Sequence, residues 1–193
     1  LDNDEIKGVW IASDALGWPF GPFIKMLLLT GQRRNEVARI QWCHVDFQNK
    51  SWTIPKEETK SNRKHVVPLS DMVIQIIDNL PRNGSYVFST NAKTPISGFS
   101  KAKKRCDKIF EIPSWQFHDL RRTAASGMAE IGIAPHVIEK VLNHSTGQIS
   151  GVAAVYNRHE YLREKTDALN AWARALGGIV GFTDNNVISI GAK

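Results

Sequence analysis

Apolar residues recur every three or four positions along most of the chain, the spacing that places them on one face of an α-helix. Residues 118–131 are typical, with core-facing positions expected at Leu120, Ala124, Met128 and Ile131. Proline and glycine mark helix ends, as Pro22 and Gly31 do for the second helix. Helices are therefore predicted over residues 3–16, 20–30, 34–42, 97–110, 118–131, 135–143, 150–158 and 160–176.

A further helix is predicted to begin after Ser70, because serine is a favoured N-cap and Asp71 suits the positive end of a helix. Its core-facing positions would be Val73, Ile76, Ile77 and Leu80.

One segment departs from the helical pattern. In residues 51–69, the β-formers Trp52, Ile54, Val66 and Val67 stand on either side of a charged, polar turn. This pattern predicts a β-hairpin. The expected fold class is mainly α with a small antiparallel β-sheet (α+β).

The carboxyl end has a different composition from the rest of the chain. The pair Gly177 and Gly178 is predicted to break the last helix, and the residues after it are apolar and nearly uncharged. We expect one domain over residues 1–176 and a tail over 177–193. Residues Val187, Ile188 and Ile190 would dock on a protein surface, in cis or in trans; a disordered end is the alternative.

Composition favours a single domain with a polyanionic partner. The 193 residues include 42% hydrophobic residues, enough for one substantial core, and 25 Lys and Arg against 19 Asp and Glu give a net charge of +6.

No apolar run approaches a membrane span and no signal-peptide pattern begins the sequence, so we expect a cytoplasmic protein. Cys43 and Cys106 fit no zinc spacing and are expected to be reduced thiols; no cofactor or metal is predicted.

The densest basic cluster is residues 100–108. On a helix, Lys101, Lys104 and Lys108 would share one face, which we interpret as contacts to nucleic-acid phosphates. A plain solvated face is the alternative.

Three motifs, TGQRRNE at 30–36, HDLRRTAAS at 118–126 and VLNH at 141–144, are followed by VYNRHEY at 155–161. In order and residue type they resemble the active-site motifs of tyrosine recombinases, the phage-integrase family. The residues that carry the resemblance are Arg33, His118, Arg121, His144 and Tyr156. It covers residues 1 to about 176 and implies the family's catalytic-domain fold, a helical body with a small sheet on one side.

The resemblance assigns a role to each residue. Two arginine forks would brace one phosphate, because guanidinium donates paired hydrogen bonds and stays charged. Tyr156 would be the nucleophile; a phenol of pKa about 10 needs a base or electrostatic help, and His118 can supply either. A hairpin lysine would protonate the leaving 5′-oxygen. Lys60 is favoured because it follows a threonine ahead of VPL, with Lys56 and Lys64 as rivals.

The chain has three tyrosines. Tyr86 lies in a short apolar run that reads as a buried strand, which leaves Tyr161 as the rival nucleophile. Tyr156 follows His144 by twelve residues, a longer connection than in many family members. It resembles that of integrases from P4-like phages and genomic islands, in which the first tyrosine of V-Y-N-R-x-x-Y is the nucleophile.

The resemblance implies a site-specific recombinase that cleaves and rejoins DNA through a 3′-phosphotyrosyl bond, without a cofactor, to integrate and excise a prophage or genomic island. Its partners would be double-stranded attachment sites, three further copies in a synaptic tetramer, and accessory DNA-bending or excisionase proteins, with no membrane; in isolation it would be a monomer. Full-length relatives carry additional amino-terminal DNA-binding domains, so we expect the chain to be a catalytic domain alone.

Two other functions remain open at this stage. A tyrosine-type topoisomerase would share the chemistry but only relax supercoils, and a non-catalytic DNA-binding regulator would not need the full residue set. A metal-dependent nuclease is less favoured, because it requires clustered carboxylates where these motifs present cations.

Overall fold

The computed structural model describes residues 1–59, 61–111, 115–144 and 161–182. The elements in chain order are α1 (Asn3–Leu16), α2 (Phe20–Thr30), α3 (Arg34–Ala38), a 3₁₀ turn (Trp42–His44), β1 (Val45–Asp46), β2 (Ser51–Ile54), a second 3₁₀ turn (Lys56–Glu58), β3 (His65–Pro68), α4 (Asp71–Asp78), α5 (Phe99–Ile109), α6 (Phe117–Glu130), α7 (Pro135–Val141) and α9 (Leu162–Val180). The predicted class, mainly α with a small antiparallel sheet, is confirmed.

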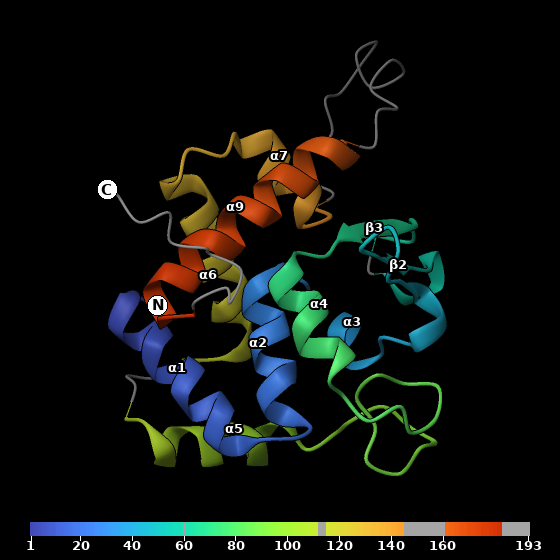
Figure 1. Cartoon of the computed structure of the whole chain (residues 1–193), viewed down its shortest axis with the longest axis vertical. Helices are drawn as coiled ribbons and strands as arrows, with labels where there is room; N and C mark the ends of the chain where they lie inside the picture. The colour runs from blue at the N-terminus through green and yellow to red at the C-terminus, as the bar shows by residue number, and fades with distance from the viewer. Residues whose placement is uncertain (60, 112–114, 145–160, 183–193) are drawn as a thin grey trace, which may run out of the picture.

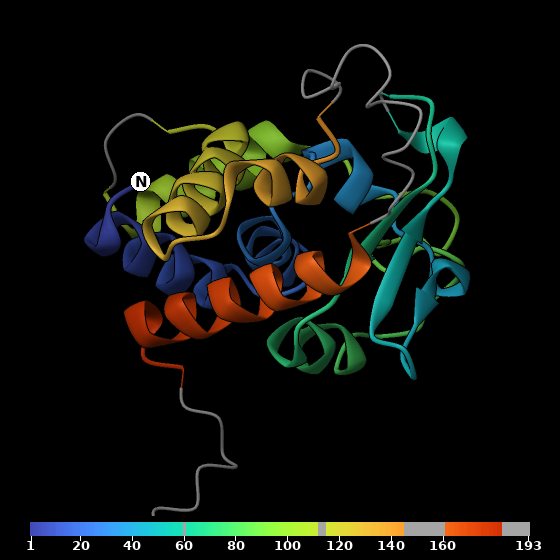
Figure 2. The same ribbon diagram turned by 90° about the horizontal axis from the view of Figure 1, so that it is seen from above.

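Helix α2 runs through the centre of the helical body (Figure 1). Its apolar sequence FGPFIKMLLLT is buried almost throughout, with Phe23, Ile24 and Leu28 fully inaccessible to solvent. Figure 2 shows it enclosed between α9 on one side and α6 and α7 on the other. The helix ends, as predicted, at Gly31, which adopts the left-handed conformation (φ 63°) and donates its N–H to Leu27 O. This end point places the chain that follows at the edge of the core.

Helix α9 docks on α2 and α6 through Trp172. The buried indole Nε1 donates to Leu28 O at 2.9 Å. On α6, Gly127 leaves the space that the ring occupies: a Cβ there would lie 2.2 Å from Trp172 Cζ3. The segment that follows Tyr161 is therefore rigidly attached to the core.

The sheet lies at one side of the helical body (Figures 1 and 2) in the order β1-β2-β3. The predicted hairpin is confirmed, with Trp52 opposite Val67 and Ile54 opposite His65. Both members of the first pair, and Ile54, are buried against the core. The two-residue strand β1 is too short for its pattern to have been recognised in the sequence.

Helix α9 corrects the predicted end of the last helix. The glycine pair at 177–178 does not break it; the helix continues to Val180 and stops at Gly181, which is left-handed (φ 70°). Gly177 is buried, and a Cβ there would approach Met72 Cε to 3.2 Å. Glycine is therefore used here for close packing, and the boundary drawn at residue 176 falls inside a helix.

Other differences are smaller. The helix predicted over 34–42 ends at Ala38, and Ser70 occupies the N-cap position of α4 although its buried hydroxyl makes no hydrogen bond there. Ile131 is 41% exposed beyond the end of α6, and Tyr86, half-buried, forms only an isolated bridge with Gln41. Ile76 and Leu80 pack partly buried against the core.

Several predictions concern residues outside the described ones. They are the helix at 150–158, the roles of Lys60 and Tyr156, and the docking of Val187, Ile188 and Ile190. None of the helices in the described ranges is long and apolar enough to cross a membrane.

Candidate functional site

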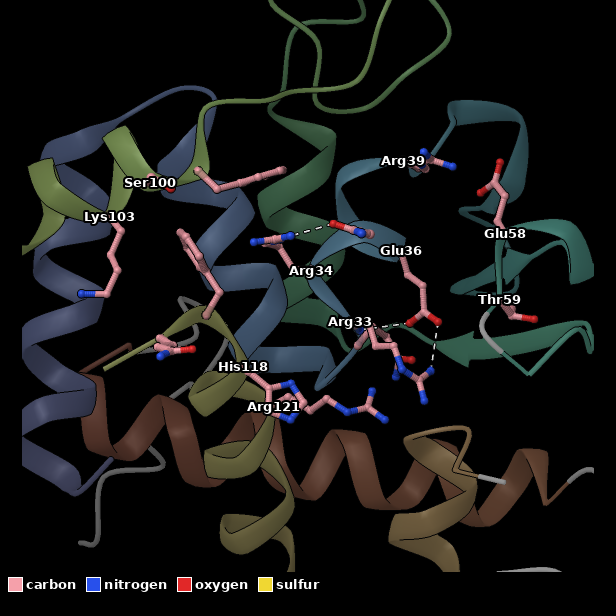
Figure 3. Close-up of a pocket in the computed structure, with 15 residues that line it drawn as sticks. Arg33, Arg34, Glu36, Arg39, Glu58, Thr59, Ser100, Lys103, His118 and Arg121 are labelled. Carbon is pink, nitrogen blue, oxygen red and sulfur yellow. Dashed lines mark hydrogen bonds and ion pairs between the residues drawn. The ribbon is translucent and has the colours of Figure 1, made fainter. Parts of the chain in front are cut away.

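An open groove of about 830 Å³ lies between α3, α5, α6 and the turn that precedes residue 60 (Figure 3). Six basic or imidazole side chains line it, whereas its carboxylates are Glu36 and Glu58. The six are Arg33, Arg34, Arg39, Lys103, His118 and Arg121. The groove is therefore suited to an anion.

Arg33 is held by the buried carboxylate of Glu36. It stands immediately before α3, where its backbone N–H donates to Glu36 Oε2 at 3.0 Å and its Nη1 donates to Glu36 Oε1 at 3.0 Å. Glu36 is only 3% exposed, so it has little choice of conformation. One carboxylate thus fixes both the main chain and the guanidinium of Arg33, as the dashed lines in Figure 3 show.

Arg121, on α6, is buried and bonded to two helix ends. Its Nη1 donates to Gly31 O at 2.8 Å, after α2, and its Nη2 donates to Leu142 O at 2.5 Å, after α7. Burial, together with the charge of Arg33, lowers the pKa of Arg121 to about 10. The guanidinium is therefore still cationic at neutral pH.

His118 and Arg121 share a face of α6 and both line the groove, as their three-residue spacing predicted. His118 is exposed, one turn closer to the start of the helix (Figure 3). The structure thus brings Arg33, His118 and Arg121 together from segments about 90 residues apart in sequence.

His144 lies just beyond the groove at the end of α7. Its Nδ1 contacts Glu139 Oε2 at 2.8 Å. The preceding residue, Asn143, accepts a hydrogen bond on its carbonyl oxygen from Arg33 Nη2 at 3.4 Å. The turn that carries His144 is therefore joined directly to one of the groove arginines.

Lys60 and Tyr156 lie outside the described residues. The neighbour Thr59 lines the groove, and its hydroxyl bonds Lys56 O and Arg63 O, which shapes the turn. The rivals Lys56 and Lys64 are exposed on that turn and do not line the groove. Tyr161 is half-buried, with its ring against His136.

The lysines predicted to contact phosphate, Lys101, Lys104 and Lys108, are exposed on α5, which confirms their helical setting. None of them lines the groove; Lys103 does. Its Nζ bonds Asp107 at 2.7 Å and lies 4.9 Å from the centre of the Trp115 ring.

Sequence reasoning missed Lys103, Arg34 and Arg39 as groove residues. The guanidinium of Arg34 lies 4.7 Å from the centre of the Phe99 ring, at the start of α5. The only sequence signal was its position next to Arg33. Which face of α5 meets the groove depends on how α5 packs against α1, and periodicity alone does not give that.

Three consecutive carbonyl oxygens at the end of α7 accept hydrogen bonds from four polar side chains, which come from three segments of the chain. Val141 O accepts from Gln32 Nε2 at 2.9 Å and contacts His65 Nε2 at 3.0 Å. Leu142 O and Asn143 O receive Arg121 and Arg33. His65 is buried, and its pKa is lowered to about 3 by burial and by the charges of Lys165, Arg121 and Arg33.

No group of three or more His, Cys, Asp or Glu side chains able to hold a metal occurs in the described part of the chain. Both cysteines are free, Cys43 at the surface and Cys106 in the core. Burial, with the charge of Asp107, raises the pKa of the Cys106 thiol to about 11, so this thiol is protonated at neutral pH.

Solved structures share this fold at low sequence identity. An integrase from mycobacterium phage Brujita superposes with a TM-score of 0.67 at 15% identity, covering 92% of this chain and 62% of the other. A lambda integrase tetramer bound to a Holliday junction gives a TM-score of 0.59 at 19% identity, with coverages of 84% and 48%. The fold is thus that of tyrosine recombinase catalytic domains.

The family follows from sequence. The sequence model of the phage integrase family matches residues 1–163 of this chain. The prophage integrase IntA of Escherichia coli K12 is 33% identical over 153 residues, which are 76% of this chain and 36% of the relative; the integrase of Shigella phage Sf6 is 28% identical over 163 residues, 77% and 40%. The chain belongs to the phage integrase family. It spans between a third and two fifths of these curated relatives' length.

Proposed function

We propose that this chain is the catalytic domain of a site-specific DNA recombinase that integrates and excises a mobile element. The observation that supports the proposal most is the pair of arginines, Arg33 and Arg121. Both are fixed by groups other than substrate, through Glu36 and through adjacent carbonyls of one turn. Donors that are already oriented stabilise a developing charge without reorganisation.

In the proposed reaction, the scissile phosphate lies in the groove and Arg33 and Arg121 bind its non-bridging oxygens. The phenol oxygen of Tyr156 attacks phosphorus, and its proton passes to His118 or to solvent. The bond from phosphorus to the 5′-oxygen breaks, and Lys60 gives that oxygen a proton. The product is a 3′-phosphotyrosyl bond, and attack by a 5′-hydroxyl of another strand reverses the step.

His144 is proposed to assist at the same phosphate from the end of the α7 turn, residues 141–144, at the carboxyl end of helix α7. The contact with Glu139 would orient its ring, so that Nε2 is the free nitrogen. Its position immediately after Asn143 connects any movement of this histidine to Arg33.

The groove rim is proposed to bind the DNA backbone on either side of the scissile phosphate. Arg34 and Lys103 both line the groove and lie over aromatic rings, which restrict their side chains; Lys103 is held further by its ion pair with Asp107. Lys101, Lys104 and Lys108 would extend this contact along the exposed face of α5. Contacts of this kind position the protein on DNA and do not read sequence.

We infer that the working assembly is a tetramer on two double-stranded attachment sites in the bacterial cytoplasm, assisted by DNA-bending or excisionase proteins, and that isolated copies are monomers. Support comes from the lambda integrase, seen as a tetramer bound to a Holliday junction, and from XerH, seen bound to its difH substrate before cleavage.

The test is incubation with a nicked duplex that carries the element's attachment-site core, followed by denaturing electrophoresis. A covalent protein–DNA adduct is expected, because the nick lets the 5′-hydroxyl fragment diffuse away. Binding without an adduct would identify a regulator instead. Relaxation of supercoiled plasmid without recombinant products would identify a topoisomerase.

A further inference from the structure

The end of α7 gathers the groove arginines and two polar side chains at one place. The carbonyl oxygens of residues 141, 142 and 143 are bonded to Gln32 and His65, to Arg121, and to Arg33 in turn. Val141 is the last residue of α7, Leu142 is its C-cap and Asn143 follows in a left-handed conformation. Carbonyls at the end of a helix have no partner within the helix and carry its negative dipole, and the carbonyl of the residue just beyond is also left unbonded by the helix. They therefore attract cations and hydrogen-bond donors from neighbouring elements.

The role of His65 follows from the chemistry of its contact. A carbonyl oxygen only accepts hydrogen bonds, so Nε2 of His65 carries the hydrogen that points at Val141 O, 3.0 Å away. The ring is 6% exposed, and the cations that act on it are Lys165 from α9, Arg121 from α6 and Arg33. Their charges and the burial keep the ring neutral, as the depressed pKa indicates.

His65 also joins three parts of the molecule. It is the first residue of β3, which begins five positions after Lys60 in the sequence. The next residue, Val66, accepts a hydrogen bond on its carbonyl oxygen from Lys165 Nζ at 2.7 Å, and Lys165 lies on α9. The start of β3 is thus bonded both to the α7 turn and to helix α9.

We propose that His65 is a positioning residue: by donating from Nε2 to Val141 O, it fixes the position of the α7 turn, whose next two carbonyl oxygens bind Arg121 and Arg33. This inference rests on the proposed function. His65 does not line the groove.

A second side chain, Gln32, also donates to Val141 O, but it does not replace the bond from His65. Gln32 Nε2 also donates to Val141 O, yet it donates equally to Thr30 O, both at 2.9 Å. Gln32 therefore holds the turn towards the end of α2, whereas His65 holds it towards the sheet. Loss of His65 should displace the turn without unfolding it.

The test compares amides of different reach at position 65. In glutamine the amide nitrogen stands where Nε2 of histidine stands, whereas in asparagine it is one bond shorter. His65→Gln should therefore retain the bond to Val141 O, and His65→Asn and His65→Phe should lose it. Ile54→Val, at the paired position on β2, is the control for a small packing change in the same sheet.

The measurements are the single-turnover rate of adduct formation at saturating nicked attachment-site duplex and the DNA affinity. His65→Asn and His65→Phe are expected to slow adduct formation on the order of 10²-fold, the scale of a 1 Å misplacement, while affinity changes by no more than about threefold because the rim cations remain. His65→Gln and Ile54→Val should stay within about fivefold of the unmodified rate, well short of that loss.

The outcomes separate the two proposals. If the unmodified chain forms no adduct, the proposed function fails. If it forms one, and folded His65→Asn reacts as fast as His65→Gln, the positioning role is overturned. It is likewise overturned if His65→Gln is as slow as His65→Asn. The Gln and Asn pair decides the matter even if His65→Phe does not fold.

Discussion

Acidification should destabilise the domain through His65. The ring is buried and neutral, with a folded-state pKa of about 3 against 6.5 in the unfolded chain. At a pH between these two pKa values, His65 is protonated in the unfolded chain and neutral in the folded domain. The contribution of His65 to stability is therefore complete above pH 6.5 and is lost as the pH falls towards 3. From pH 7 to pH 5 the loss amounts to about 2 kcal/mol.

His65→Gln isolates this contribution, because glutamine keeps the donor and does not titrate. The other five histidines are present in both proteins, so their effects cancel in the difference. Urea unfolding at pH 7, 6 and 5, followed by tryptophan fluorescence, gives the free energy of unfolding for each protein. The unmodified domain should lose about 2 kcal/mol more than the variant between pH 7 and pH 5. Equal losses would show that His65 titrates normally in the folded state, and the reasoning about its burial would be refuted.

Three further predictions concern catalysis and binding. Adduct formation should persist in excess chelator, because arginines, lysine and histidines supply the charge that a metal would; loss of cleavage that magnesium restores would contradict this. Arg33→Ala should slow adduct formation at least about 10²-fold. Arg174→Ala, an equal charge change on the exposed face of α9, should leave the rate unchanged. An effect of only a few-fold for Arg33→Ala would contradict its proposed catalytic role. Arg34→Ala should reduce the log-log salt slope of DNA binding by about 0.9, the loss of one phosphate contact, with Arg174→Ala again as the control; an unchanged slope would place Arg34 away from DNA.

The helices could be predicted well from the sequence where local signals agree with packing. Both α1 and α2 have the predicted bounds, because apolar periodicity and the glycine after α2 point the same way. Helix α9 was predicted too short because a glycine pair ordinarily ends a helix. Here Gly177 lies inside the helix because Met72 packs so closely against it that a Cβ would be crowded. This is a tertiary contact, which the local sequence does not reveal.

The candidate site could be predicted in part. Motifs identified Arg33, His118 and Arg121, and the structure brings these three into one groove. His65 was missed because it begins an ordinary strand pattern, HVVPL. The feature that makes it important is its hydrogen bond to the backbone carbonyl of Val141. Backbone carbonyls have no sequence signature, so the turn that holds both arginines becomes visible only once α7 is packed against β3 and α6.

The most direct test of the central claim is to identify the residue that becomes bonded to DNA. The adduct formed on the nicked duplex would be digested with nuclease and protease and its modified peptide sequenced by mass spectrometry. The account predicts a nucleotide on Tyr156, no adduct from Tyr156→Phe although DNA binding is retained, and a normal adduct from Tyr161→Phe. A nucleotide on Tyr161, or an adduct that survives in Tyr156→Phe, would contradict it.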